Sequence, residues 1–279
     1  EVVFQTGSQQ RTEFGQRFVR AAEAVRAGRI GKVLSVHVGV GDAPVWCDLP
    51  GEALEPGLDW DRWLGPAPER EYNEILSPRG VHGHYPKWRN YREYCNGGLA
   101  DMGAHHFDIA QWALGMDDSG PVSVEGHGEF PSSGLFTNCT NVNFTVRYAN
   151  GVPMHCRTRF EGGGTARFVG ERGWLDIARD KMSASDNNLL REMQAPNKKV
   201  QLELSNNHHD NFFACVRSRG KPIADVEIGH RTTTVCNLGQ IAMVLGRPLK
   251  WDPVKEEFVG DEMANRLRGR AMRSPWSLA

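Results

Sequence analysis

The sequence predicts an α+β fold in which a large, mostly antiparallel sheet has helices packed on one face. Two patterns lead to this prediction. Residues 2–41 follow a strand, helix and strand pattern, and a series of short strand-like segments with hairpin turns begins later in the chain. The strand-like segments cover residues 122–129, 140–148, 152–160, 165–170 and 174–177.

The N-terminal elements are short. Residues 2–6 form an apolar run that predicts a buried strand. Thr12 can cap a helix whose apolar residues recur at helical spacing until Gly28. Residues 32–41 alternate valine and leucine with polar or small residues, which predicts a second strand.

Proline, glycine and charged residues interrupt residues 42–96, which predicts a long loop region. Its many aromatic residues indicate that this region is ordered, because disordered segments rarely carry them. Such a surface suits a sugar ring, and packing of the loop onto the domain is the alternative role for each aromatic side chain. The aromatic residues are Trp46, Trp60, Trp63, Tyr72, Tyr85, Trp88, Tyr91 and Tyr94.

Helical patterns return towards the C-terminus. Residues 180–205 are irregular and charged, and helices are expected over 208–219, through 235–245 and after Asp261.

Composition narrows the class of partner. The net charge is −1 and no basic run is present, which argues against nucleic acid and anionic membranes and favours a small neutral ligand. No apolar run approaches the roughly 18 residues of a membrane helix, so a soluble, cytoplasmic protein is expected. The six cysteines are scattered without a CxxC pair, which predicts free thiols and no metal site.

Three polar residues mark the segment 97–115, GGLADMGAHHFDIAQWALG. Asp101, His105 and Asp108 are spaced i, i+4 and i+7, so a helix through them places all three within about 60° of one another. An imidazole of near-neutral pKa can take up a proton, and adjacent carboxylates stabilise its charged form. His106 falls on the apolar face and is predicted to be structural. The stripe is therefore the predicted site of chemistry.

The chain lacks the sequence signatures of a cofactor loop. There is no G-x-G-x-x-G between a strand and a helix, and no P-loop, GxSxG or HExxH motif. The glycines at 162–164 precede a predicted strand, which favours a turn over a phosphate cradle.

These motifs give the chain a resemblance to the C-terminal catalytic half of the Gfo/Idh/MocA oxidoreductases, the family of glucose-fructose oxidoreductase and inositol dehydrogenase. The resemblance runs nearly end to end, and two of its motifs are similar to one bacterial branch of the family. It rests on GSQQR at 7–11, RAGRIGKV at 26–33, GLDWDRWLGPAP at 57–68, the segment 97–115, LGRPLKWDP at 245–253 and GDEMAN at 260–265.

The resemblance implies a domain organisation and an activity. Residues 1–8 would be the last strand of a dinucleotide-binding domain that this chain lacks, and residues 9–279 the substrate-binding and catalytic domain. The activity implied is an NAD(P)-dependent oxidation of a carbinol carbon in a sugar or cyclitol, with NAD or NADP bound mainly by the missing domain. The family's Glu-Lys-Pro motif is not found here, so the chain alone is expected to be inactive. Family members usually associate through the open face of the sheet, which implies a homo-oligomer.

The resemblance also implies roles for single residues. His105 would be the general base on the substrate hydroxyl, with Asp101 supporting it. The further candidates for substrate binding are Asp108, Trp88, Arg89 and His230, and those for cofactor binding are Gln10 and Arg11. Packing or helix capping is the alternative role for the substrate-binding candidates.

Two other functions stay open at this point. One is nicotinamide-assisted cleavage of a glycoside, in which the sugar is oxidised transiently and then restored. The other is a sugar-binding or dimerisation domain without catalysis.

Overall fold

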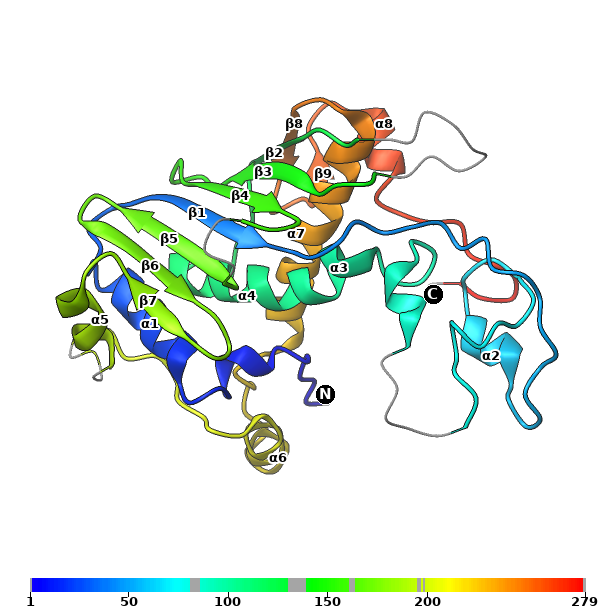
Figure 1. The fold of residues 1–279 in the computed structure, drawn as a ribbon, viewed down its shortest axis with the longest axis horizontal. Coiled ribbons are helices and arrows are strands. Elements are labelled where there is room, and N and C mark those ends of the chain that lie inside the picture. The colour runs from blue at the N-terminus through cyan, green and yellow to red at the C-terminus, as the bar shows by residue number, and fades with distance from the viewer. Residues whose placement is uncertain are drawn as a thin grey trace.

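The computed structural model describes residues 2–80, 86–129, 139–160, 164–194, 197 and 199–277. Tyr85 and the glycines at 162 and 163 lie outside the described residues. Within the described part, nine strands form one sheet in the order β7-β6-β5-β1-β4-β3-β2-β8-β9 (Figure 1). The strands are β1 Val33–Gly39, β2 Ser123–Gly126, β3 Asn143–Arg147, β4 Pro153–Arg157, β5 Ala166–Gly170, β6 Gly173–Ile177, β7 Met182–Ala184, β8 Leu249–Asp252 and β9 Glu257–Phe258.

The sheet is mostly antiparallel, as predicted. Only the pairing of β1 with β4 is parallel among the described strands, because β1 is separated from β4 by the loop region and by helices. Each of the five predicted strand-like segments corresponds to a strand of this sheet. Strands β2 to β5 are shorter than the predicted segments, and β6 starts one residue earlier than predicted.

Helices cover one face of this sheet, which confirms the predicted α+β architecture. Helices α1, α4 and α7 pack side by side beneath the strands (Figure 1). The helices are α1 Arg17–Arg26, α2 Trp60–Leu64, α3 Gly97–Ala100, α4 Met102–Leu114, α5 Asn187–Gln194, α6 His208–Ser218, α7 Val226–Leu245 and α8 Glu262–Arg266, with 3-10 turns η1 Gln9–Arg11 and η2 Lys87–Asn90.

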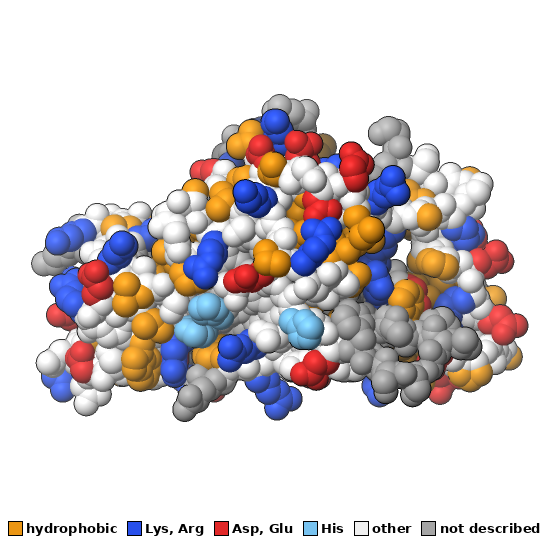
Figure 2. All heavy atoms as spheres, turned by 90° about the horizontal axis from the view of Figure 1, so that it is seen from above, with side chains coloured by type: hydrophobic (Ala, Val, Ile, Leu, Met, Phe, Trp, Pro, Cys, Tyr) orange, Lys and Arg blue, Asp and Glu red, His pale blue; other side chains and the backbone are white. Residues whose placement is uncertain are grey.

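Side-chain alternation explains why only one face is covered. In β1, Val36 and Val38 are fully buried, whereas His37 between them is half-buried on the other face. His37 lies against His155 of β4, with ring centroids 5.1 Å apart. Seen from above, the surface carries basic, acidic and histidine side chains with separated apolar areas between them (Figure 2).

The N-terminal prediction is wrong in two places. Residues 2–6 form no strand: Gln5 makes an isolated bridge with Asp225, while Val2 and Phe4 are 86% and 56% exposed. Helix α1 begins at Arg17 and not near Thr12, because residues 14–16 have φ values of 61°, 66° and 61°. This left-handed backbone cannot continue a right-handed helix.

The predicted C-terminal helices are confirmed, and each begins at a side-chain cap. Asn207, Asp225 and Asp261 accept hydrogen bonds from backbone N–H groups of the first turns of α6, α7 and α8. The irregular prediction for 180–205 is wrong in part, since it contains β7 and α5.

The loop region forms an ordered lobe beside the sheet, which we call the aromatic lobe and define as residues 42–80 and 86–96 (Figure 1). Trp60 and Trp63 stack with centroids 4.5 Å apart, and Tyr72 and Tyr94 pack edge-on against them. Arg273 from the C-terminal segment bonds to the Asp61 carboxylate, which ties that segment to the lobe.

A buried ion pair fixes η1 against the middle of α4. The Nη2 and Nε groups of Arg11 donate to Asp108 Oδ1 at 2.7 and 2.9 Å, and Nη2 also reaches Asp117 Oδ1 at 2.7 Å. The guanidinium lies 4.8 Å from the centroid of the Trp112 ring. Arg11 is 3% exposed and Asp108 is fully buried. If one of the two residues were removed, water could not solvate the charge of the other.

We expect Arg11→Met to lower the free energy of unfolding by about 3–5 kcal/mol, because it leaves the Asp108 carboxylate buried without its partner. Urea denaturation measures the loss. Arg29→Met is the matched control: Arg29 pairs with Glu192 at the exposed surface, where an ion pair contributes about 1 kcal/mol or less. Equal losses in the two variants would contradict the assignment.

Candidate active site

The start of α4 is set by a close backbone crossing. A Cβ on Gly97, whose φ is +65°, would lie 2.6 Å from Pro44 N, and a Cβ on Gly98 would lie 2.7 Å from Asp42 N. The Gly98 N–H donates to Asp42 O at 2.8 Å. Only glycine allows the two chain segments to approach this closely. The glycine pair therefore holds the end of β1 and the entry to α3 together.

Asp101 occupies the break that follows. Its φ and ψ of −76° and −81° separate α3 from α4, so it stands at the N-cap of α4 and not within one continuous helix as predicted. Its Oδ1 lies 3.4 Å from Arg89 Nε, and the Arg89 guanidinium lies 4.5 Å from the centroid of the Trp88 ring. The structure thus brings together three residues that the sequence predicted.

His105 lies in the first turns of α4 and is half-buried. Burial lowers the pKa of its imidazole, the Arg179 charge lowers it further, and the Asp101 carboxylate opposes these effects. Gln10 Nε2 donates to the His105 carbonyl at 3.3 Å. The ring is therefore neutral near pH 7, with an acidic neighbour that favours its protonated form.

Arg179 is the residue that sequence reasoning missed. It lies in the turn between β6 and β7, where its Nε donates to Gln10 Oε1 at 3.1 Å and its guanidinium lies over the Phe14 ring. Arg17 holds this turn by donating to the Arg179 carbonyl. A lone arginine in a charged, irregular segment carries no local signal of this role.

Asp108, Arg11 and Gln10 are buried and hydrogen-bonded within the protein. Both oxygens of Asp108 bind Arg11, and neither residue has more than 3% of its surface exposed. Asp108 and Arg11 are thus paired with each other, and their contacts with substrate and cofactor stay predictions. Gln10 is also buried, and it links Arg179 to the His105 backbone.

Two other histidines that the sequence singled out, His230 and His106, form hydrogen bonds with other parts of the chain. His230 on α7 is half-exposed, and its Nε2 donates to Glu256 at 2.6 Å in the turn before β9, so its described contacts are with that turn. His106 donates from Nδ1 to the Gly39 carbonyl, and burial lowers its pKa to about 4. A neutral, hydrogen-bonded His106 agrees with the predicted structural role.

Neither a metal cluster nor a membrane span is found in the described part of the chain. No group of three or more His, Cys, Asp or Glu side chains is arranged to hold a metal ion there. None of the helices among those residues is both long and apolar enough to cross a bilayer. The six cysteines are free thiols.

Comparison with known proteins identifies the class. The model of the Gfo/Idh/MocA oxidoreductase family's C-terminal alpha/beta domain matches residues 45–278. The chain therefore belongs to this family, as its motifs suggested. A search of curated proteins finds no match.

Solved structures share the fold. The chain is similar to aldose-aldose oxidoreductase from Caulobacter crescentus complexed with glycerol, at 17% identity and a TM-score of 0.52 over 89% of this chain and 64% of that one. It is also similar to the WlbA dehydrogenase from Bordetella pertussis in complex with NADH and UDP-GlcNAcA, at 13% identity and a TM-score of 0.53 over 90% of this chain and 64% of that one. It thus spans less than two thirds of the length of these relatives.

The charges of Arg179 and Asp101 shift the pKa of His105 in opposite directions. We expect Arg179→Gln to raise the pKa of His105 towards its ordinary value, because the variant removes a positive charge that disfavours the imidazolium. The histidine resonances followed by NMR against pH measure the shift in the chain as it stands. Arg167→Gln, on the open face of the sheet, is the control and should leave the titration of His105 unchanged. A pKa that stays the same or falls in Arg179→Gln would contradict the placement.

Proposed function

We propose that the protein is an NAD(P)-dependent oxidoreductase acting on a carbinol carbon of a sugar or cyclitol, with this chain as its substrate-binding and catalytic domain. The observation that carries the proposal is a half-buried imidazole, His105, in the first turns of α4, whose pKa is lowered by burial and by the Arg179 charge and raised by the Asp101 carboxylate. In this domain organisation residues 9–279 form the domain and residues 1–8 lead into it from a dinucleotide-binding domain.

The chemistry requires a base for the hydroxyl proton. As the carbinol carbon loses hydride, its hydroxyl proton passes to the neutral imidazole of His105. Asp101 stabilises the imidazolium that forms, and Arg179 keeps the pKa low enough for the base to be free before the reaction. Arg89 and Trp88 adjoin Asp101, where a guanidinium can donate to sugar hydroxyls and an indole can face the apolar side of a ring.

The hydride acceptor is a nicotinamide, NAD or NADP, which supplies the oxidising group when it is bound. The residues that would face its reacting end are those around His105, among them the partly exposed Arg179, which is hydrogen-bonded to Gln10. They offer no glycine-rich phosphate loop, so the diphosphate would be held by the dinucleotide-binding domain. A similar fold in the WlbA dehydrogenase, solved with NADH and UDP-GlcNAcA, supports both the cofactor and the sugar class.

We expect His105→Ala in the intact protein to lower the rate of sugar oxidation by about 100-fold or more, which is the scale of general base catalysis. The formation of reduced nicotinamide across a panel of sugars and cyclitols measures the rate. His209→Ala changes an exposed histidine on α6 and serves as the control. Full activity of His105→Ala would overturn the proposed role.

We also propose that copies of the protein associate through the open face of the sheet. Val169 lies on this face beside Arg167, and it is half-buried in the single chain. We expect the wild-type protein to be a dimer or larger by light scattering, and Val169→Glu to shift it towards monomer. Leu204→Glu, at an exposed position outside the sheet, is the control. A wild-type monomer would contradict the proposal.

A further inference from the structure

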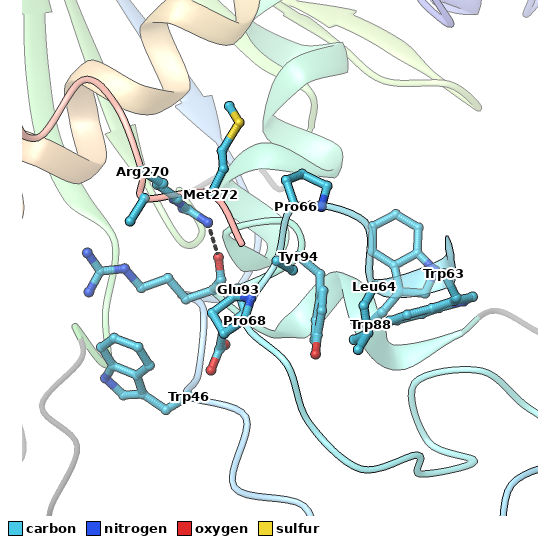
Figure 3. A pocket seen from close by; sticks show the side chains of 13 residues that line it. Trp46, Trp63, Leu64, Pro66, Pro68, Trp88, Glu93, Tyr94, Arg270 and Met272 are labelled. Atoms are coloured by element: carbon cyan, nitrogen blue, oxygen red, sulfur yellow. Dashed lines mark hydrogen bonds between the residues drawn. The ribbon is translucent and has the colours of Figure 1, made fainter. Parts of the chain in front are cut away.

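A cavity of about 830 Å³ lies between the aromatic lobe and residues 270–272 of the C-terminal segment (Figure 3). Small-molecule sites in proteins are roughly 300–1,000 Å³ in volume, so this cavity is of that kind. Its walls are mainly aromatic and aliphatic, and they include Trp46, Trp63, Trp88 and Tyr94. His105 and Asp101 do not line it. The cavity is therefore separate from the position of the general base.

Each tryptophan in the wall is braced by a neighbouring group. The Arg92 guanidinium lies 4.9 Å from the Trp46 ring centroid, and Arg89 lies 4.5 Å from that of Trp88. Trp63 stacks on Trp60 at 4.5 Å. These contacts fix the indoles before any ligand arrives, and a preorganised wall binds without the cost of ordering its side chains.

The C-terminal segment completes the cavity. Arg270 donates from Nη1 to the Arg92 carbonyl at 2.5 Å, which Figure 3 marks, and from Nη2 to Asn96 Oδ1 at 2.9 Å. Arg273 donates to the Asp61 carboxylate and to the Gly65 carbonyl of the lobe. Two regions from opposite ends of the sequence are thus joined by charge-assisted hydrogen bonds, so the cavity is a built site.

The polar groups of the cavity are few. Arg92 and Arg270 provide donors, and Glu93 provides an acceptor while it also accepts the Cys47 N–H at 3.1 Å. Flat apolar walls with one acceptor and two donor groups match a ring that has an apolar C–H side and several hydroxyls at its edge. A pyranose has this chemistry, whereas a purely apolar ligand would form no hydrogen bonds with the polar groups of the wall.

The position of the cavity connects it to the base. Trp88 lines the cavity, the next residue Arg89 stacks on it, and Arg89 pairs with Asp101 at the start of α4. This continuous contact leads from the aromatic wall to the residue that supports His105. A ligand that follows this path of contacts would have one ring beside Asp101 and His105 and a second ring in the cavity.

We propose that this cavity binds the second ring of a glycosidic substrate, so that the protein acts on a glycoside or oligosaccharide and not on a free monosaccharide. The proposal rests on the proposed function, because the first ring is the one whose carbinol faces His105. The second ring takes no part in hydride or proton transfer. It adds binding energy and selects the length of the substrate.

Calorimetry on the intact protein tests this without turnover. The probes are methyl β-glucoside against methyl β-cellobioside, methyl α-maltoside and methyl β-lactoside. We expect at least one disaccharide to bind about tenfold or more tightly than the monosaccharide, a difference that corresponds to about 1.4 kcal/mol. We expect Trp46→Leu to remove this difference and to leave monosaccharide binding unchanged.

Trp174→Leu is the matched control, since Trp174 also packs against an arginine, Arg167, but lies on β6 outside the cavity. Arg92→Gln is the second cavity variant and replaces Trp46→Leu if circular dichroism shows that the latter is unfolded. The proposal is overturned if no disaccharide binds more tightly than the monosaccharide, or if the cavity variant keeps the difference. His105→Ala should keep the disaccharide preference, so a failure here is distinct from a failure of the proposed catalytic role.

Discussion

The close approach of the backbone at Gly97 and Gly98 to residues 42–44 is the constraint on which the candidate site depends. The contact joins the strand end of β1 to the first turn of α3, with no space for a Cβ on either glycine. It therefore sets where the helix breaks, and the break places Asp101 beside Arg89. Because the aromatic lobe leaves the sheet at residue 42 and returns at residue 96, the same contact also fixes both ends of the lobe. A larger residue at either position would displace His105, Asp101 and the cavity together.

Two arginines near the candidate site, Arg11 and Arg179, have different effects on their surroundings. Arg11 is satisfied by buried carboxylates and holds η1 to α4, so its charge is used for architecture. Arg179 is only half-buried and acts on the imidazole of His105, so its charge is used to tune a pKa. Arg11 follows Gln10 in the sequence, and Arg179 donates to the Gln10 side chain. The two arginines differ in burial and in the groups that they contact.

Sequence patterns predicted the sheet and α4 because alternation and helical spacing are local signals. Residues 14–16 could not be predicted from such signals, since Phe14 and Gln16 adopt left-handed backbone conformations that favour glycine and are rare for other residues. Asp108 seemed available because its spacing from His105 is visible in the sequence, whereas its partner Arg11 lies far away in the chain. Arg179 was missed for the same reason: its effect on His105 exists only after the β6–β7 turn folds over η1.

The place of β1 in the sheet has a consequence for the order of folding. This strand is near the centre of the sheet, yet both of its neighbours, β4 and β5, come from the second half of the chain. Pairing over so long a separation requires closure of a large loop before any contact compensates for the lost chain entropy. On the ribosome, β1 therefore stays unpaired until the antiparallel strands downstream have been synthesised. The centre of the sheet is then among the last parts of the molecule to form.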